Sequence, residues 1–224
     1  MARFTKADVL ATIRNDGIVP VFHHHDEQVC TAVARRVAAG GLSTLEFTNR
    51  GDGAVDRFAH LMRWASDALP DLILGVGSVI DPATAGHVID IGANFVFAPS
   101  FSAEVAIVCN RRNIPYVPGC GTVTEIQRAY DAGADIVKIF PAGSLGGPSF
   151  LQAVRAPCPW IEAIPTGGVD SSVDSFKGWF GAGAPAVGMG SKLLPSPMVA
   201  SGDWDGIEAQ VASAVADVAA ARAS

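Results

Sequence analysis

The length, composition and charge of the chain exclude several classes of protein. Its 224 residues are 49% hydrophobic and 17% charged, which excludes a disordered chain and suits one large domain over residues 1–224. The net charge of −6 disfavours a basic nucleic-acid or membrane-surface protein. No stretch approaches the roughly 20 apolar residues of a membrane span, and the start is not a signal peptide. We therefore expect a cytoplasmic protein without nucleic-acid or membrane partners.

The first predicted element is a short helix, because apolar residues recur at helical spacing from Phe4 to Ile13 before Gly17. Eight short apolar runs rich in β-forming residues follow and are typical of buried strands. They are Ile18–Phe22, Thr44–Thr48, Ile73–Val79, Asn94–Pro99, Tyr116–Gly119, Ile136–Phe140, Glu162–Thr166 and Ala186–Gly190.

The segments between these runs carry helix signals. Asp81-Pro82 is an N-cap followed by proline at the first helical position, and Thr122-x-x-Glu125 is a capping-box pattern. The predicted helices are Glu27–Ala39, Ala54–Leu69, one from Pro82 to about Gly92, one from Ser102, one from Thr122 to about Gly133, Ser149–Val154, Ser171–Phe180 and an amphipathic C-terminal helix, Trp204–Arg222.

This alternation predicts an α/β fold with a parallel sheet covered on both faces. Eight strand–helix units in one domain favour a (β/α)8 TIM barrel with an N-terminal helix and a C-terminal amphipathic helix. An open, doubly wound sheet is the alternative. In a barrel, the active site lies at the carboxyl ends of the strands, so polar residues there are the candidates for function.

Lys138 is the clearest candidate, because two apolar residues flank it on each side. Alternation places it on the same face as Ile136 and Phe140, inside the predicted barrel. A charged amine is costly to bury, and a neutral amine is a nucleophile toward a carbonyl carbon. A lysine paired with a buried carboxylate for structure alone is the alternative.

Glu46 and Arg50 form a second candidate group at the end of the second predicted strand. A carboxylate there can move protons, and an arginine in the following loop can hold a substrate carboxylate. An ion pair of Glu46 with Lys138 or Arg50 that takes no part in chemistry is equally compatible with the pattern.

Glycine-rich segments end several predicted strands. Thr166-Gly167-Gly168 and Gly188-Met189-Gly190-Ser191 follow the last two, where barrels of this type commonly bind phosphate through backbone N–H groups. Tight turns alone would also explain the glycines. The run His23-His24-His25 follows the first strand. Successive side chains diverge along an extended chain, so we expect no metal site there and instead a solvated or substrate-facing loop.

These motifs together resemble the 2-keto-3-deoxy-6-phosphogluconate (KDPG) and 4-hydroxy-2-oxoglutarate (KHG) aldolases. The resemblance covers about Ile18 to Leu194 and is strongest in Val-Lys-Ile-Phe-Pro around Lys138 and Pro-Thr-Gly-Gly around Thr166. It also includes Leu-Glu-Phe-Thr-Asn-Arg around Glu46 and Gly-Met-Gly-Ser before Lys192. The family implies a trimeric (β/α)8 barrel and a class I aldolase that uses no metal and no cofactor.

The resemblance also implies roles for individual residues. Lys138 matches the Schiff-base lysine and Glu46 the general acid/base. The matched substrate-binding positions are Arg50 and Ser78 for the pyruvyl carboxylate, Pro99 and Thr166 in the pocket, and Gly167, Gly168 and Ser191 around a phosphate. The implied substrate is a 2-keto acid, expected to be phosphorylated. KDPG would yield pyruvate and glyceraldehyde 3-phosphate, and 4-hydroxy-2-oxoglutarate would yield pyruvate and glyoxylate.

Two other functions fit parts of the pattern. A metal-dependent pyruvate aldolase would use Glu46 and a histidine as ligands and would lose activity with a chelator. A non-catalytic phosphosugar-binding barrel would be stabilised by ligand without turnover. Neither needs a lysine that points into the barrel, so the imine mechanism is the favoured hypothesis.

Overall fold

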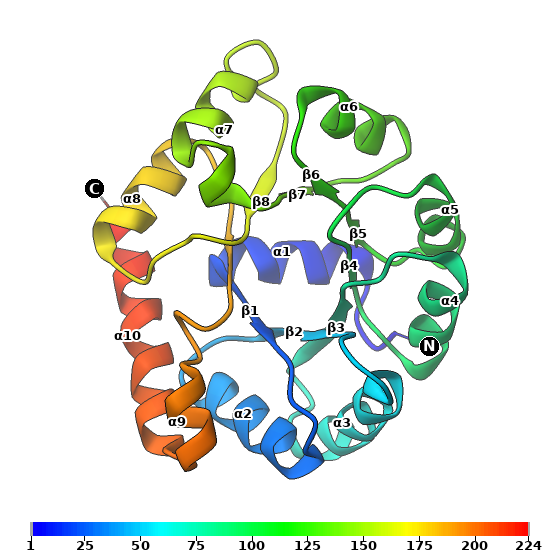
Figure 1. The fold of residues 1–224 in the computed structure, drawn as a ribbon, viewed down its shortest axis with the longest axis vertical. Helices are drawn as coiled ribbons and strands as arrows, with labels where there is room; N and C mark the ends of the chain where they lie inside the picture. Colours follow the sequence, from blue (N-terminus) through cyan, green and yellow to red (C-terminus); the bar gives the residue numbers. More distant parts are fainter. Residues whose placement is uncertain (1, 224) are drawn as a thin grey trace.

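The computed structural model describes residues 2–223 as alternating parallel strands and helices (Figure 1). The strands are β1 (Ile18–Phe22), β2 (Thr44–Thr48), β3 (Ile73–Gly77), β4 (Val96–Phe97), β5 (Tyr116–Val117), β6 (Gly119–Cys120), β7 (Val137–Ile139), β8 (Ala163–Pro165) and β9 (Val187–Met189). The helices are α1 (Lys6–Asp16), α2 (Glu27–Ala39), α3 (Ala54–Ala68), α4 (Pro82–Ile91), α5 (Ala103–Arg111), α6 (Val123–Asp131), the 3₁₀ turn η1 (Ala142–Leu145), α7 (Pro148–Arg155), α8 (Val173–Gly181), α9 (Ser196–Ser201) and α10 (Trp204–Arg222).

The strands form a curled parallel sheet in two hydrogen-bonded parts, ordered β5-β4-β3-β2-β1-β9 and β6-β7-β8. Pro118 separates β5 from β6, so one run of chain pairs with β4 through its first half and with β7 through its second. A bridge between Thr166 and Gly188 connects the end of β8 to β9. The arrangement is consistent with a TIM-type barrel, and Figure 1 shows the helices surrounding the strands.

Most helices begin at residues whose side chains satisfy the free N–H groups of the first turn. Asp26 caps α2, Asp81 caps α4 ahead of Pro82, and Ser102 and Thr122 cap α5 and α6. These starts confirm the predictions for the four helices. The 3₁₀ turn η1 and helix α9 were not predicted, because both are short and carry no extended apolar period.

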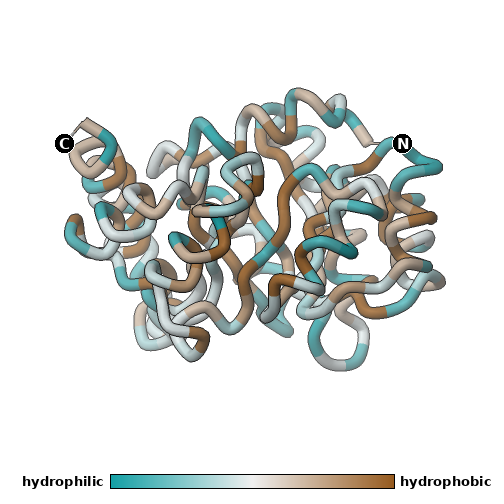
Figure 2. Tube along the Cα trace, turned by 90° about the horizontal axis from the view of Figure 1, so that it is seen from above, coloured by the Kyte–Doolittle hydropathy of each residue, from teal (hydrophilic) through white to brown (hydrophobic). Residues whose placement is uncertain are grey.

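The larger part of the hydrophobic core lies between the strands and the surrounding helices. Hydrophobic segments run through the interior of the molecule in Figure 2, and many of the hydrophilic residues lie at its periphery. Helix α10 packs against α2 and α8, and buries Ile207, Val211 and Val218 there. It thereby fills the position of the helix that follows the last strand.

Helix α1 closes the end of the sheet where the strands begin. Its buried residues Val9, Leu10 and Ile13 belong to a second core cluster. The other members of this cluster are residues within the strands or just before them. Those residues are Val19, Ile73, Phe95, Phe97, Val117, Ile136, Ile164 and Ala186. In Figure 1 the helix crosses the centre of the ring of strands. The amino-terminal end of the interior is therefore filled with apolar side chains.

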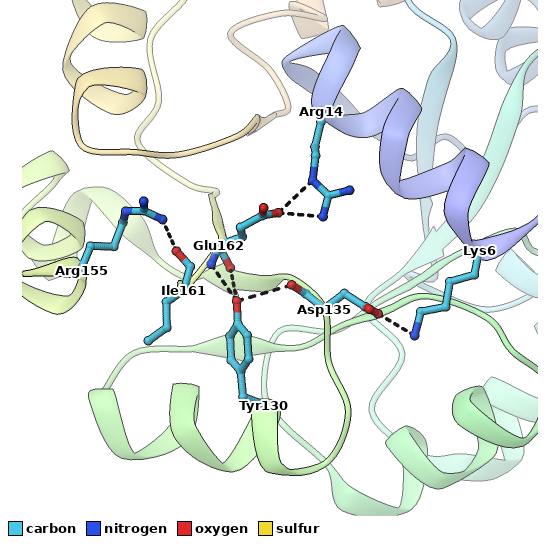
Figure 3. A network of polar contacts seen from close by, with 7 residues as sticks. All are labelled: Lys6, Arg14, Tyr130, Asp135, Arg155, Ile161 and Glu162. Carbon is cyan, nitrogen blue, oxygen red and sulfur yellow. Dashed lines mark hydrogen bonds and ion pairs between the residues drawn. The ribbon is translucent and has the colours of Figure 1, made fainter. Parts of the chain in front are cut away.

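Polar contacts around this end hold α1 in place (Figure 3). Lys6 lies 2.6 Å from Asp135, and Arg14 lies 2.9 Å from Glu162, which joins the two ends of α1 to the segments before β7 and β8. The hydroxyl of Tyr130 accepts a hydrogen bond from the backbone N–H of Glu162 at 2.7 Å. Burial raises the pKa of this phenol.

Candidate active site

Two charged side chains meet on the inner face of the curled sheet. Lys138, in the middle of β7, and Glu46, in the middle of β2, are both buried, and Lys138 Nζ lies 3.9 Å from Glu46 Oε2. Both come from positions where the side chain points inward between apolar neighbours. The two residues that sequence analysis singled out therefore meet on the inner face of the curled sheet.

The surroundings of Lys138 are largely aromatic. Its Nζ lies 5.7 Å from the ring centroid of Phe97 and 5.2 Å from that of Phe140. Glu46 is its single carboxylate partner among the described residues. This leaves the amine in an apolar pocket with one acidic neighbour, an environment suited to a nucleophilic amine and a proton-transfer group.

The Glu46 carboxylate lies against Gly77 of β3, in space that a side chain at this position would fill. A Cβ at Gly77 would overlap Glu46 Oε1 and Cδ, and Gly77 has no side chain to do so. Oε2 has no hydrogen-bond partner in the part of the chain that is described. Burial raises the pKa of Glu46, opposed by the nearby positive charges of Lys138 and Arg50. The carboxyl group is therefore biased toward accepting a proton.

Arg50 and Ser191 line a cavity of about 480 Å³ at the carboxyl ends of β1, β2 and β9, beside α9. His23, His24 and Thr48 also line it. Arg50 is close enough to Glu46 to lower the pKa of that carboxyl. The structure thus brings together residues predicted to bind two different parts of a substrate, on the side of the sheet where an active site was expected.

The remaining predicted site residues end strands or follow them. Ser78 directly follows β3 with a φ of 60°, and Pro99 follows β4 beside Gly119, where a Cβ would overlap the Pro99 carbonyl group. Thr166, after β8, is buried, and its Oγ1 has no hydrogen-bond partner within residues 2–223.

The two glycines after Thr166 pack against η1, where the backbone N–H of Gly143 donates to the carbonyl oxygen of Gly167 at 2.8 Å. Gly167 and Gly168 have φ values of 84° and 85°, in the left-handed region that favours glycine. Neither lines the cavity that contains Ser191. The predicted phosphate cradle is therefore divided between two neighbouring loops.

A larger cavity, of about 790 Å³, lies at the opposite end of the strands. Its cationic groups are mostly engaged, because Arg14 pairs with Glu162 and Arg222 donates to backbone carbonyl oxygens of Asn15, Arg14 and Pro185. None of the described residues that line it is a carboxylate or a buried amine suited to carbonyl chemistry. We assign the candidate active site to the end that contains Lys138.

Sequence reasoning placed His23 in a solvated or substrate-facing loop and did not include it among the site residues, although it lines the cavity. The signal was present: Val19, Val21 and His23 alternate along one face of β1 and its extension, and Val19 belongs to the interior cluster. The glycine-rich strand ends were interpreted as phosphate-binding segments or tight turns, and the structure shows a further role, because Gly77 and Gly188 make room for Glu46 and Thr166.

No group of three or more His, Cys, Asp or Glu side chains within residues 2–223 is arranged to hold a metal ion. None of the helices in the same range is both long and apolar enough to cross a membrane.

Comparison with known proteins identifies the family. The model of the KDPG and KHG aldolase family matches residues 9–210. A 2-dehydro-3-deoxy-phosphogluconate aldolase of Dickeya dadantii is 32% identical over 203 residues, 91% of this chain and 92% of the relative. The KHG/KDPG aldolase of Escherichia coli K12 is 30% identical over 190 residues, 85% of this chain and 86% of the relative. The chain belongs to the KDPG and KHG aldolase family.

Solved structures agree with this assignment. The fold matches that of a KDPG aldolase from Legionella pneumophila with a TM-score of 0.83 and 27% identity, covering 91% of this chain and 96% of that one. That structure contains pyruvate captured as a covalent carbinolamine intermediate. The family resemblance inferred from the motifs is confirmed.

Proposed function

We propose that this chain is a class I aldolase, a carbon–carbon lyase, in which Lys138 forms a Schiff base with a 2-keto acid. The observation that carries the proposal is the buried Lys138–Glu46 pair, with 3.9 Å between Nζ and Oε2. The covalent pyruvate adduct in the Legionella pneumophila relative supports it. The preferred substrate is KDPG, with 4-hydroxy-2-oxoglutarate as a second substrate.

The neutral amine of Lys138 adds to C2 of the keto acid to give a carbinolamine, which takes up one proton from solvent and loses water to give an iminium ion. Glu46 takes the proton of the C4 hydroxyl as the C3–C4 bond breaks. The C3–C4 electron pair forms the C2=C3 double bond, and the π electrons of the C2=N bond pass to nitrogen. The aldehyde is released and an enamine of pyruvate remains. Glu46 returns its proton to C3, and hydrolysis of the new iminium ion frees pyruvate and Lys138. The raised pKa of Glu46 suits a group that both accepts and returns a proton.

The other predicted residues supply binding. Arg50 and the Ser78 hydroxyl hold the pyruvyl carboxylate, and fixing this end of the substrate supplies proximity for the reaction. Pro99 and Thr166 line the pocket, and the unpartnered hydroxyl of Thr166 is available to a substrate oxygen. Gly167, Gly168 and Ser191 bind the phosphate through backbone N–H groups at the carboxyl ends of β8 and β9.

We further propose that residues 1–224 form one domain, a closed (β/α)8 barrel. Nine strands in residues 2–223, with β5 and β6 counted as one interrupted strand, give eight positions around the ring. A homotrimer is proposed from the family resemblance. Ile80 and Val123, which are 66% and 52% exposed after β3 and β6, offer apolar surface for such contacts. A cytoplasmic location remains a prediction of the sequence.

The test is reduction with borohydride in the presence of pyruvate, followed by intact mass and peptide mapping. The wild type is expected to carry a reduced pyruvyl group on Lys138. The matched variant Lys138→Arg retains a long nitrogen-containing side chain but has no amine able to form the imine, and is expected to carry no adduct. A wild-type enzyme that cleaves substrate without an adduct would contradict the proposal, and loss of that activity with EDTA would indicate the metal-dependent alternative. Stabilisation by a sugar phosphate without turnover would indicate a binding protein.

A further inference from the structure

The cavity beside α9 lies at the carboxyl ends of β1 and β2, beyond Glu46 on β2. Val21 is paired with Glu46 in the register of β1 and β2, and Thr48 is two residues beyond Glu46 on the same face. At about 3.3 Å per residue, Thr48 and His23 lie roughly 7 Å further toward the carboxyl ends of the strands. A substrate with C2 bound to Lys138 would extend its far end past Glu46 into this cavity.

The hydrogen bonding of His23 determines what its ring can offer to a ligand. Its Nδ1 lies 3.2 Å from the carbonyl oxygen of Thr48. A carbonyl oxygen only accepts, so Nδ1 carries the hydrogen in this contact. In the neutral ring, Nε2 then has a lone pair and no hydrogen, and it makes no hydrogen bond within residues 2–223. The neutral ring can accept a hydrogen bond at Nε2 but cannot donate one there.

The charges around His23 favour its neutral form. Burial lowers its pKa, the Thr48 carbonyl opposes that shift, and the positive charges of Arg57, Arg50 and His24 lower it further. Neither Arg50 nor Arg57 forms an ion pair within residues 2–223, and the charges named as shifting the pKa of His23 are all positive. At neutral pH the ring is therefore an acceptor in a positively charged part of the cavity.

We propose that His23 is a specificity-determining residue that accepts a hydrogen bond, through Nε2, from a hydroxyl group on the part of the substrate that leaves as the aldehyde. The inference rests on the proposed aldolase function. It assigns the site to 2-keto-3-deoxy sugar acids with a hydroxyl at C5. A five-carbon diacid instead brings a carboxylate to this depth, and its oxygens would face Nε2 of the neutral His23 ring, which is itself an acceptor.

The test uses the condensation direction, in which pyruvate adds to an aldehyde. Glyceraldehyde 3-phosphate and 3-oxopropyl phosphate differ by one hydroxyl, which becomes the C5 hydroxyl of the product. In the wild type we expect a higher kcat/KM for the hydroxylated aldehyde. His23→Phe keeps a planar ring without the acceptor, and should lower kcat/KM about tenfold for glyceraldehyde 3-phosphate alone, the usual order for one hydrogen bond. His23→Gln, which has an acceptor oxygen, should retain part of the preference.

The matched control is His25→Phe, because His25 is exposed and does not line the cavity. It should retain the wild-type ratio between the two aldehydes. Borohydride trapping of pyruvate, which has no part reaching His23, should be equal in all four proteins and shows that each is folded. Suppose that His23→Phe traps pyruvate normally. If its ratio of kcat/KM between the two aldehydes is unchanged, or if kcat/KM falls equally for both, the role of His23 is overturned and the aldolase function is not. Absence of trapping in the wild type would overturn the aldolase function and this inference with it.

Discussion

The glycine on β3 beside Glu46 provides a sharp test of the site. In Gly77→Ala, the new methyl group would overlap the Glu46 carboxylate, which is buried and has little room to move. Gly77 is not in the left-handed region of φ, so backbone strain does not add to the effect. The substitution therefore displaces the carboxylate from its position 3.9 Å from Lys138.

The size of the effect follows from the geometry. A displacement of about 1 Å in a catalytic group can cost about 100-fold in rate, and complete loss of a general base costs about 100- to 10,000-fold. We expect kcat/KM of Gly77→Ala to fall by about 100-fold. Overpacking should also lower the free energy of unfolding by about 1–3 kcal/mol. For a chain of this size each kcal/mol lowers Tm by about 2–4 °C.

The assay combines steady-state retro-aldol kinetics with thermal unfolding. Gly86→Ala is the matched control, because a Cβ at this helical position meets nothing within 4 Å. It should retain activity and gain about 0.4–1 kcal/mol. Combining Gly77→Ala with Glu46→Asp shortens the carboxylate side chain, and should recover stability relative to Gly77→Ala alone. Wild-type turnover in a folded Gly77→Ala enzyme would refute the assigned position and role of Glu46.

Three further predictions concern the floor of the site and its titrating groups. Ile13→Ala removes a fully buried side chain of α1 and should lower the free energy of unfolding by about 2–5 kcal/mol in urea titrations, while the folded variant still traps pyruvate. Burial raises the pKa of Asp16 above 3.8, against hydrogen bonds from Ser43 and Thr44. The protonated Asp16 carboxyl thus stabilises the fold below its unfolded pKa, and this contribution is lost as pH rises. The Tm of Asp16→Asn should therefore rise relative to that of the wild type between about pH 3 and 7. A Tm difference that stays constant over this range would contradict the argument. The raised pKa of Glu46 predicts that kcat/KM falls on acidification through a value above 4.5, measured as the acid limb of the pH profile and absent from Glu46→Gln.

The residues that sequence analysis located most clearly are those that break a local pattern. Lys138 and Glu46 are charged residues inside apolar strands, and alternation alone orients both inward. The structure confirms that they meet, since Nζ and Oε2 are 3.9 Å apart. The apolar runs themselves predicted the strand positions, and the intervals Ile18–Phe22 and Thr44–Thr48 match β1 and β2.

Features that depend on packing between distant strands could not be predicted in this way. The space at Gly77 is explained only by the Glu46 side chain on the neighbouring strand. The inward face of β1 continues to His23, although the apolar run ends at Phe22. Pro118 has no N–H for the ladder and divides one expected strand into β5 and β6. The space at Gly77 depends on a contact that a single sequence does not contain, whereas the alternation that reaches His23 and the missing N–H of Pro118 are visible in the sequence.

The apolar floor formed by α1 has a consequence for the sequence of events in catalysis. Because one end of the interior is filled by Val9, Leu10 and Ile13, small molecules enter and leave through the opposite end. On the proposed mechanism, the aldehyde lies nearer that opening and pyruvate is still covalently attached below it. The aldehyde must then depart first and pyruvate second. Pyruvate should accordingly inhibit cleavage competitively with the keto acid, because both react with the free form of Lys138.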